Sequence, residues 1–262
     1  MTITVENVSK IFSQKGVRAR RQVSAVRGAS FSVLPGETLG LVGESGSGKS
    51  TLARIVLGLL KPTSGSVTFN GRALDEFSKR DWAEYRHRVQ AVFQDPRSSL
   101  NWRLKIEDII TEPVRNYGIG DKKSRRELAG SLLEQVNVDP KVLTRRPPDL
   151  SGGQLQRVAI ARALALDPSY LVCDEPLSAL DVSVQAGVLN LLLSLQESRN
   201  LAMLFISHDL GVVRHLSDRV LVMYRGEIVE SASSREFYGN PRHPYSRLLL
   251  GLPDGEGEEI GV

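Results

Sequence analysis

The sequence predicts an α/β fold in which a mostly parallel sheet is combined with an antiparallel β layer and a helical lobe. Short apolar runs at 38–42, 170–173, 201–206 and 219–224 have the length of buried strands, and helical stretches separate the last three. Strands that alternate with helices favour crossover connections, and these produce parallel pairing. A run from about 94 to 166 looks mainly helical and is broken by Pro96, Pro113, Pro140, Pro147 and Pro148.

The amino-terminal part contributes the antiparallel layer. Residues 2–8 and 29–34 are alternating or apolar, which is typical of short strands. Between them, the stretch 13–26 is polar and basic, with Arg18, Arg20 and Arg21. We expect this insert to be a solvated loop; contact with lipid or with a partner is the alternative. We expect the closing residues 255–262 to be a loose tail.

Composition restricts the class of function. The 262 residues carry 34 basic and 30 acidic side chains, a net charge of +4, and the two signs are interspersed. This pattern is typical of a mildly basic globular protein, so we expect no nucleic acid as partner. The single cysteine, Cys173, excludes an internal disulfide framework and fits a reducing cytoplasm.

The apolar runs also limit any direct contact with a membrane. Glu6 and Lys10 interrupt the amino terminus where a signal peptide needs an apolar stretch. The longest apolar runs fall short of the roughly 18 residues that a spanning helix needs. We therefore expect any membrane role to depend on partners.

The strongest motif is GESGSGKST at 43–51, which fits the P-loop pattern GxxxxGK[ST] between a predicted strand and a predicted helix. Gly46 and Gly48 allow a turn tight enough for backbone N–H groups to converge on a phosphate. We expect Lys49 to reach the β- and γ-phosphates and Ser50 to bind Mg²⁺. The full predicted cradle is Gly43, Glu44, Ser45, Gly46, Ser47, Gly48, Lys49, Ser50 and Thr51.

A second motif ends the apolar run 170–173 with two carboxylates, Asp174 and Glu175. Adjacent residues in a strand point to opposite sides, so the two carboxylates are expected to have different tasks. Asp174 is predicted to hold Mg²⁺, and Glu175 to orient and deprotonate the attacking water.

A third motif, LSGGQ at 150–154, places Ser151, Gly152, Gly153 and Gln154 at the start of a predicted helix, a position suited to an anion. Together with the P-loop and the two carboxylates, it resembles the signature of ABC ATPases. That resemblance implies a P-loop NTPase fold of the ABC type. It also implies that the signature reaches ATP held by a second ATPase subunit, identical or related, so that dimerisation is part of catalysis.

Further residues acquire roles only through this resemblance. Gln94 matches the glutamine that contacts Mg²⁺ and water, and His208 matches the histidine that contacts the γ-phosphate. Asp181, in the SALD segment 178–181, matches the loop at the dimer interface. Phe12 is the candidate for stacking on adenine, with a core position as the alternative. The guanine-reading NKxD motif is missing from the sequence, which favours ATP over GTP.

The tail points to one branch of the family. Residues 240–248, NPRHPYSRL, resemble the carboxy-terminal segment of bacterial oligopeptide, dipeptide and nickel importer ATPases, as do 93–101 and 146–148. The implied organisation is an ATPase domain at 1–235, with the helical lobe at about 95–166, followed by a tail at 236–262. With Cys173 as the only cysteine, we expect no iron–sulfur cluster.

The resemblance also implies partners and a location. Such subunits work at the cytoplasmic face of the membrane with two membrane-spanning permease subunits and, indirectly, an extracytoplasmic solute-binding protein. The permeases are expected to contact the surface between about 96 and 113. We therefore predict an ATPase that powers import of peptides or of nickel and other metal chelates. The alternatives are a soluble ABC ATPase without a membrane partner and a regulatory nucleotide-binding module without hydrolysis.

Overall fold

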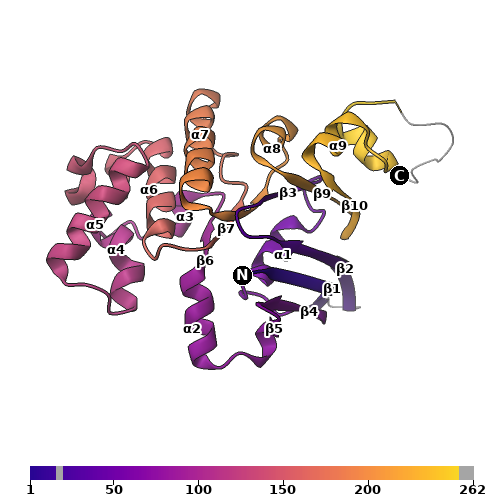
Figure 1. The fold of residues 1–262 in the computed structure, drawn as a ribbon, viewed down its shortest axis with the longest axis horizontal. Coiled ribbons are helices and arrows are strands. Elements are labelled where there is room, and N and C mark those ends of the chain that lie inside the picture. The colour runs from indigo at the N-terminus through magenta and orange to yellow at the C-terminus, as the bar shows by residue number, and fades with distance from the viewer. Residues whose placement is uncertain (16–19, 254–262) are drawn as a thin grey trace. The chain divides into compact units, whose positions relative to one another are not determined.

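The computed structural model describes residues 1–15 and 20–253. The chain divides into two compact units (Figure 1). Unit 1 comprises Met1–Trp82 with Ala202–Val262, and unit 2 comprises Ala83–Leu201. Helix α2 (Lys79–Arg88) contains the boundary between them.

Unit 1 contains the predicted antiparallel layer. Its four-stranded sheet has the order β2-β1-β4-β5, formed by β1 (Ile3–Lys15), β2 (Arg20–Val33), β4 (Ser64–Phe69) and β5 (Arg72–Ala73). The short 3-10 helix η1 (Leu74–Glu76) follows β5. All three pairings in this sheet are antiparallel.

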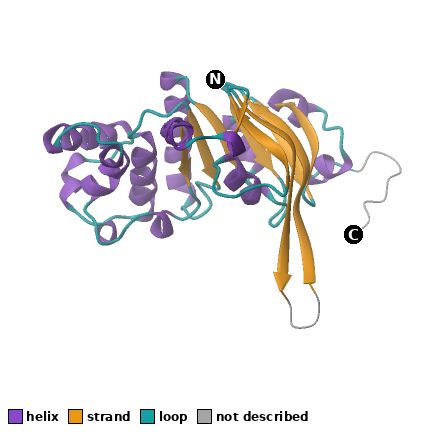
Figure 2. Ribbon diagram, turned by 90° about the horizontal axis from the view of Figure 1, so that it is seen from below, coloured by secondary structure: helices purple, strands orange, loops and turns teal. Residues whose placement is uncertain are grey.

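Residues 13–15 and 20–26 of the basic insert form strands, not the loop expected from the sequence. Residues 11–15 pair with 20–24, from Ile11 opposite Ser24 to Lys15 opposite Arg20, so β1 and β2 extend as a long antiparallel pair (Figure 2). Arg18 lies outside the described residues. The polar composition suggested a loop, but a ladder of backbone hydrogen bonds forms a two-stranded ribbon even where polar side chains such as Gln22 stay exposed. The expected tail at 255–262 also lies outside the described residues.

The second group of strands in unit 1 is β3 (Thr38–Val42), β8 (Ala202–Ile206), β9 (Arg219–Tyr224) and β10 (Glu227–Ser233), in the order β10-β9-β3-β8. β3 is parallel to both β8 and β9, as predicted. Every residue of β3 and β8 is buried, which explains why their sequences are continuously apolar rather than alternating. The helices of this unit are α1 (Lys49–Val56), α8 (Leu210–Leu216), α9 (Ser234–Gly239) and α10 (Pro244–Leu249).

Unit 2 contains one parallel pair of strands, β6 (Val89–Val92) and β7 (Tyr170–Asp174). Its helical elements are α3 (Pro96–Ser99), α4 (Ile106–Asn116), α5 (Lys122–Gln135), η2 (Pro140–Thr144), η3 (Pro147–Asp149), α6 (Gly152–Leu164) and α7 (Val182–Arg199). The helical content expected for this stretch is therefore present. β7 is buried throughout, and burial raises the pKa of the Cys173 thiol.

The prolines of unit 2 were expected to break helices, and Pro113 does not. Pro96, Pro140 and Pro147 each occupy the first position of a helix, where no N–H bond is lost. Pro113 instead lies inside α4, which continues to Asn116. Pro113 has no N–H group to donate within the helix. The apolar face of α4, which includes Ile110 and Val114, is nevertheless buried.

Candidate functional site

The loop between β3 and α1 has the backbone that a phosphate cradle requires. Gly43, Gly46 and Gly48 all have positive φ, at 147°, 82° and 110°. A Cβ atom at Gly43 would collide with the carbonyl oxygen of Met223, and one at Gly48 with that of Ala25. Only glycine fits these two positions, since both the dihedral angle and the neighbouring backbone exclude a side chain.

Lys49 begins α1 and is 4% exposed. Its Nζ donates to the carbonyl oxygens of Gly43 and Glu44, both at 2.7 Å. The ammonium group is therefore held over the loop that the sequence predicts as the cradle. The hydroxyl of Ser47 is buried and has no hydrogen-bond partner among the described residues, which leaves a polar atom of the loop for a ligand or water to satisfy.

The turn between β9 and β10 supports this loop from the side. Arg225 and Gly226 form the turn with φ of 47° and 91°. The N–H of Gly226 donates to the carbonyl oxygen of Ser47 at 3.0 Å. Sequence reasoning missed this contact, because nearly 180 residues separate its partners and no motif marks them.

We predict that Gly43→Ala lowers the stability of the nucleotide-free protein more than Gly46→Ala does. Both substitutions place a non-glycine residue at a positive φ, which costs about 1–2 kcal/mol. Only Gly43 adds a collision with Met223, because a Cβ atom at Gly46 meets nothing within 4 Å. Thermal unfolding without nucleotide checks the order, and equal losses would contradict the steric argument.

The predicted catalytic carboxylates, Asp174 and Glu175, lie in unit 2. β7 ends at Asp174, which is 8% exposed, and Glu175 follows in the left-handed region with φ 49°. Glu175 therefore lies outside the strand. The expectation that strand alternation points Asp174 and Glu175 to opposite sides is wrong, because only Asp174 belongs to β7. A non-glycine residue in this region is strained, and such residues concentrate at functional sites.

Glu175 is tied to two neighbouring segments of unit 2. The Nε2 of Gln94 donates to its Oε2 at 3.4 Å. The hydroxyl of Ser178 donates to its carbonyl oxygen at 3.0 Å. The structure therefore brings the predicted water-contacting glutamine and the predicted general base together. Asp181, at the amino-terminal end of α7, is exposed as an interface residue must be.

The signature segment forms a complete helix cap. The hydroxyl of Ser151 accepts from the N–H of Gln154 at 3.3 Å, and Oε1 of Gln154 accepts from the N–H of Ser151 at 3.0 Å. This capping box fixes the first turn of α6, and Ser151 remains exposed. A Cβ atom at Gly153 would collide with the side chain of Val184 on α7, which explains the second glycine.

The two remaining predicted residues lie in unit 1. His208 is exposed directly after β8. Phe12 lies in β1, is 40% exposed, and has the Nζ of Lys10 5.4 Å from its ring centroid. The alternative that Phe12 is a core residue is therefore wrong, whereas its stacking on adenine stays a prediction.

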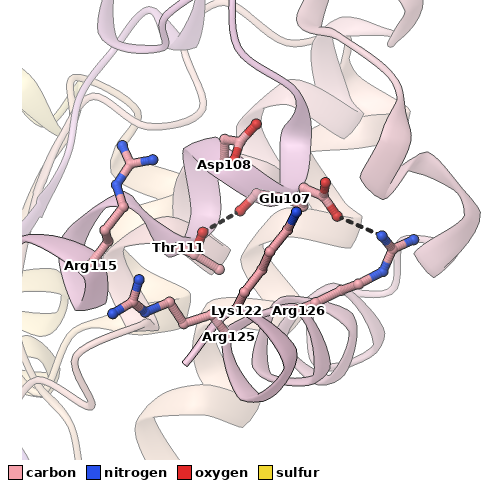
Figure 3. Close-up of a pocket in the computed structure, with 7 residues that line it drawn as sticks. All are labelled: Glu107, Asp108, Thr111, Arg115, Lys122, Arg125 and Arg126. Carbon is pink, nitrogen blue, oxygen red and sulfur yellow. Dashed lines mark hydrogen bonds and ion pairs between the residues drawn. The ribbon is translucent and has the colours of Figure 1, made fainter. Parts of the chain in front are cut away.

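A charged cavity of ≈ 320 Å³ lies in unit 2, and three of its lining residues belong to the stretch 96–113 that is expected to contact the permeases (Figure 3). Glu107 and Arg126 form an ion pair at 3.2 Å across it, and the hydroxyl of Thr111 donates to the carbonyl oxygen of Glu107 at 2.7 Å. Arg125 donates to the carbonyl oxygens of Ile119 and Gly120. The ion pair joins α4 to α5, and the other bonds stay within α4 or between α5 and the loop before it, so we interpret the cavity as a solvated charged face. The other lining residues are Asp108, Arg115 and Lys122.

Comparison with known proteins decides the family. The model of the ABC transporter family matches residues 26–178, which is more than half of the chain. This chain belongs to the ABC transporter family. The expected fold class and the expected ATPase activity are thereby confirmed, and the chain is an ABC ATPase that binds nucleotide.

The chain is also similar to individual ABC proteins. It is 51% identical over 221 residues to a putative peptide import ATP-binding protein of Brucella ovis, covering 84% of this chain and 70% of the relative. It is 48% identical over 245 residues to the oligopeptide transport ATP-binding protein OppF of Escherichia coli, covering 91% and 73%. The resemblance to the peptide importer branch is confirmed by these relatives.

A solved structure supports the fold. The ATP-binding cassette MJ0796, a dimer bound to ADP and Pi, has a TM-score of 0.79 and 29% identity, covering 89% of this chain and 99% of that one.

For the ABC protein described here, no helix in residues 1–15 and 20–253 is long and apolar enough to cross a membrane.

Proposed function

We propose that this protein is the ATP-hydrolysing subunit of an ABC importer for peptides, bound at the cytoplasmic face of the membrane. The observation that carries the proposal is the 48% identity to an oligopeptide transport ATP-binding protein over 91% of the chain. The family membership favours it over an ATPase without a membrane partner. Import of nickel or other metal chelates stays a prediction of the sequence.

We assign the phosphate-binding role to the P-loop and its lysine. The proposal is supported by the glycine backbone of the loop and by the position of the Lys49 ammonium group over it. The amino-terminal end of α1 adds backbone N–H groups and the positive end of the helix dipole. Ser45 and Thr51 complete the proposed cradle.

Mg²⁺ fits the donors that the motifs supply. Ser50, Gln94 and Asp174 offer hydroxyl, amide and carboxylate oxygens, which are the hard ligands that this ion prefers. Asp174 is 8% exposed, and a buried carboxylate requires a cation or donors. When bound, Mg²⁺ neutralises charge on the phosphates. No group of three His, Cys, Asp or Glu residues in the described parts of the chain forms a separate metal site.

Glu175 is proposed as the general base and Gln94 as the residue that orients its carboxylate. Nε2 of Gln94 donates to Oε2 of Glu175, and the carboxylate is proposed to accept a proton from the attacking water. His208 is proposed to donate a hydrogen bond to the γ-phosphate. Phe12 is proposed to stack on adenine.

The active unit is proposed to be a dimer with an identical or related ATPase subunit. Ser151, Gly152, Gly153 and Gln154 would contact ATP bound to the other subunit, and Asp181 would lie at the interface. The exposed capping box at the start of α6 supports this proposal, as does the dimeric state of MJ0796. The proposed domain limits are 1–235 for the ATPase, with the lobe at about 95–166, and 236–262 for the tail.

Isolation of the intact membrane complex tests the proposed function. We expect two permease subunits and a second ATPase subunit to co-purify, and proteoliposomes that contain the complex and its solute-binding protein to accumulate labelled oligopeptide with ATP. A complex with Glu175→Gln is the matched control and should not accumulate peptide. Uptake of a nickel chelate without peptide uptake would contradict the assigned cargo, and an ATPase without permeases would contradict the importer.

A further inference from the structure

The carboxy-terminal segment 240–249 reaches the P-loop within unit 1. This segment contains α10, and Tyr245 at the second position of that helix is 1% exposed. The Tyr245 ring packs on that of Tyr224 in β9, with centroids 4.2 Å apart and planes inclined by 32°. This packing fixes the direction of the Tyr245 side chain.

The hydroxyl of Tyr245 accepts a hydrogen bond from the N–H of Glu44 in the P-loop at 3.0 Å. That N–H and the carbonyl of Gly43 belong to one peptide group, which is planar and rigid. The same carbonyl accepts from Nζ of Lys49 at 2.7 Å. A single peptide plane is therefore held by Tyr245 on one side and by Lys49 on the other.

Glu230 of β10 anchors the segment that presents Tyr245. Its two carboxylate oxygens accept from the N–H groups of Arg242 and His243 at 2.9 and 3.0 Å. Burial by itself raises the pKa of Glu230, but neighbouring hydrogen-bond donors, among them these two N–H groups, outweigh it and lower the pKa. Nδ1 of His243 in turn accepts from the N–H of Tyr245 at 3.1 Å.

We propose that Tyr245 is a positioning residue for ATP binding, whose hydroxyl fixes the orientation of the peptide between Gly43 and Glu44 and, through it, the Lys49 ammonium group. The inference rests on the proposed phosphate-binding role of Lys49. It gives the carboxy-terminal segment a task in the nucleotide site. The competing reading is that Tyr245 only fills space against Tyr224.

Tyr245→Phe separates the two readings, because it removes the hydroxyl and keeps the ring. The N–H of Glu44 then loses its acceptor, and we expect the Kd for ATP to rise by about 3- to 10-fold. Equilibrium titration of the purified full-length protein with ATP measures the change. Tyr117→Phe is the matched control: its hydroxyl donates to the carbonyl oxygen of Ala83 at 2.7 Å in unit 2, and its loss should leave the Kd unchanged.

A double-mutant cycle with Lys49→Ala tests whether Tyr245 acts through the lysine. We expect Tyr245→Phe to weaken ATP binding in the natural background and to have little further effect once Lys49 is replaced. Equal fold-changes in both backgrounds, or an unchanged Kd for Tyr245→Phe alone, would overturn the inference. If Lys49→Ala alone leaves ATP binding intact, the proposed role of the P-loop lysine fails instead, so the two failures are distinguishable.

Discussion

Glu175→Gln is expected to reduce ATP turnover by about 10²- to 10⁴-fold, the usual contribution of a general base. The amide has nearly the shape of the carboxylate, and its oxygen can still accept from Gln94. It cannot take a proton from water, so the chemical step is lost while the contacts that bind ATP remain. Steady-state phosphate release measures the loss.

The same variant is expected to bind ATP normally and to accumulate as an ATP-bound dimer, because the ATP that both subunits contact is no longer hydrolysed. Size-exclusion chromatography with ATP and Mg²⁺ measures the dimer. Glu134→Gln, an equivalent change at an exposed position of α5, serves as the control and should retain turnover. Turnover by Glu175→Gln within a few-fold of the natural protein would remove Glu175 from the role of base.

Lys49→Ala is expected to abolish measurable turnover because it removes the ammonium group from the mouth of the P-loop. The loss of turnover in this variant should be accompanied by weaker ATP binding. A Ser151→Arg variant should also lose turnover but bind ATP normally, since the bulky side chain would obstruct only the surface offered to the other subunit. Titration with ATP distinguishes the two losses.

Mixing these two inactive variants is expected to recover turnover if Ser151 acts on ATP held by the other subunit. A mixed dimer then contains one site with an intact Lys49 and an intact Ser151. Analytical ultracentrifugation with one fluorescent partner establishes that mixed dimers form. Mixed dimers without any recovered turnover would contradict the composite site.

The local parts of the nucleotide site could be predicted from the sequence. The P-loop was identifiable because three glycines, a lysine and a flanking apolar strand occur within a few residues, and the structure gives each glycine a positive φ. The capping box at Ser151 is a local signal of the same kind. Strands β3 and β9 were predicted with their observed limits because continuous apolar runs mark buried strands.

Features that depend on distant segments could not be predicted. The continuation of β1 to Lys15 and the start of β2 at Arg20 were missed because polar composition suggests a loop, and only the pairing partner shows a strand. Pro113 lies inside α4 among buried residues of that helix, although a proline in the local sequence predicts a break. The contact of Tyr245 with Glu44 joins residues 201 positions apart, and a motif search has no means of pairing them.

The burial of Cys173 simplifies experiments on this protein. It is the only cysteine in the sequence, it is 0% exposed in β7, and burial raises the pKa of its thiol, so little nucleophilic thiolate is present or accessible. Maleimide dyes and thiol-specific bifunctional crosslinkers therefore find no accessible cysteine on the folded protein. A cysteine introduced on α6 beside the capping box would report subunit closure in an otherwise unaltered chain.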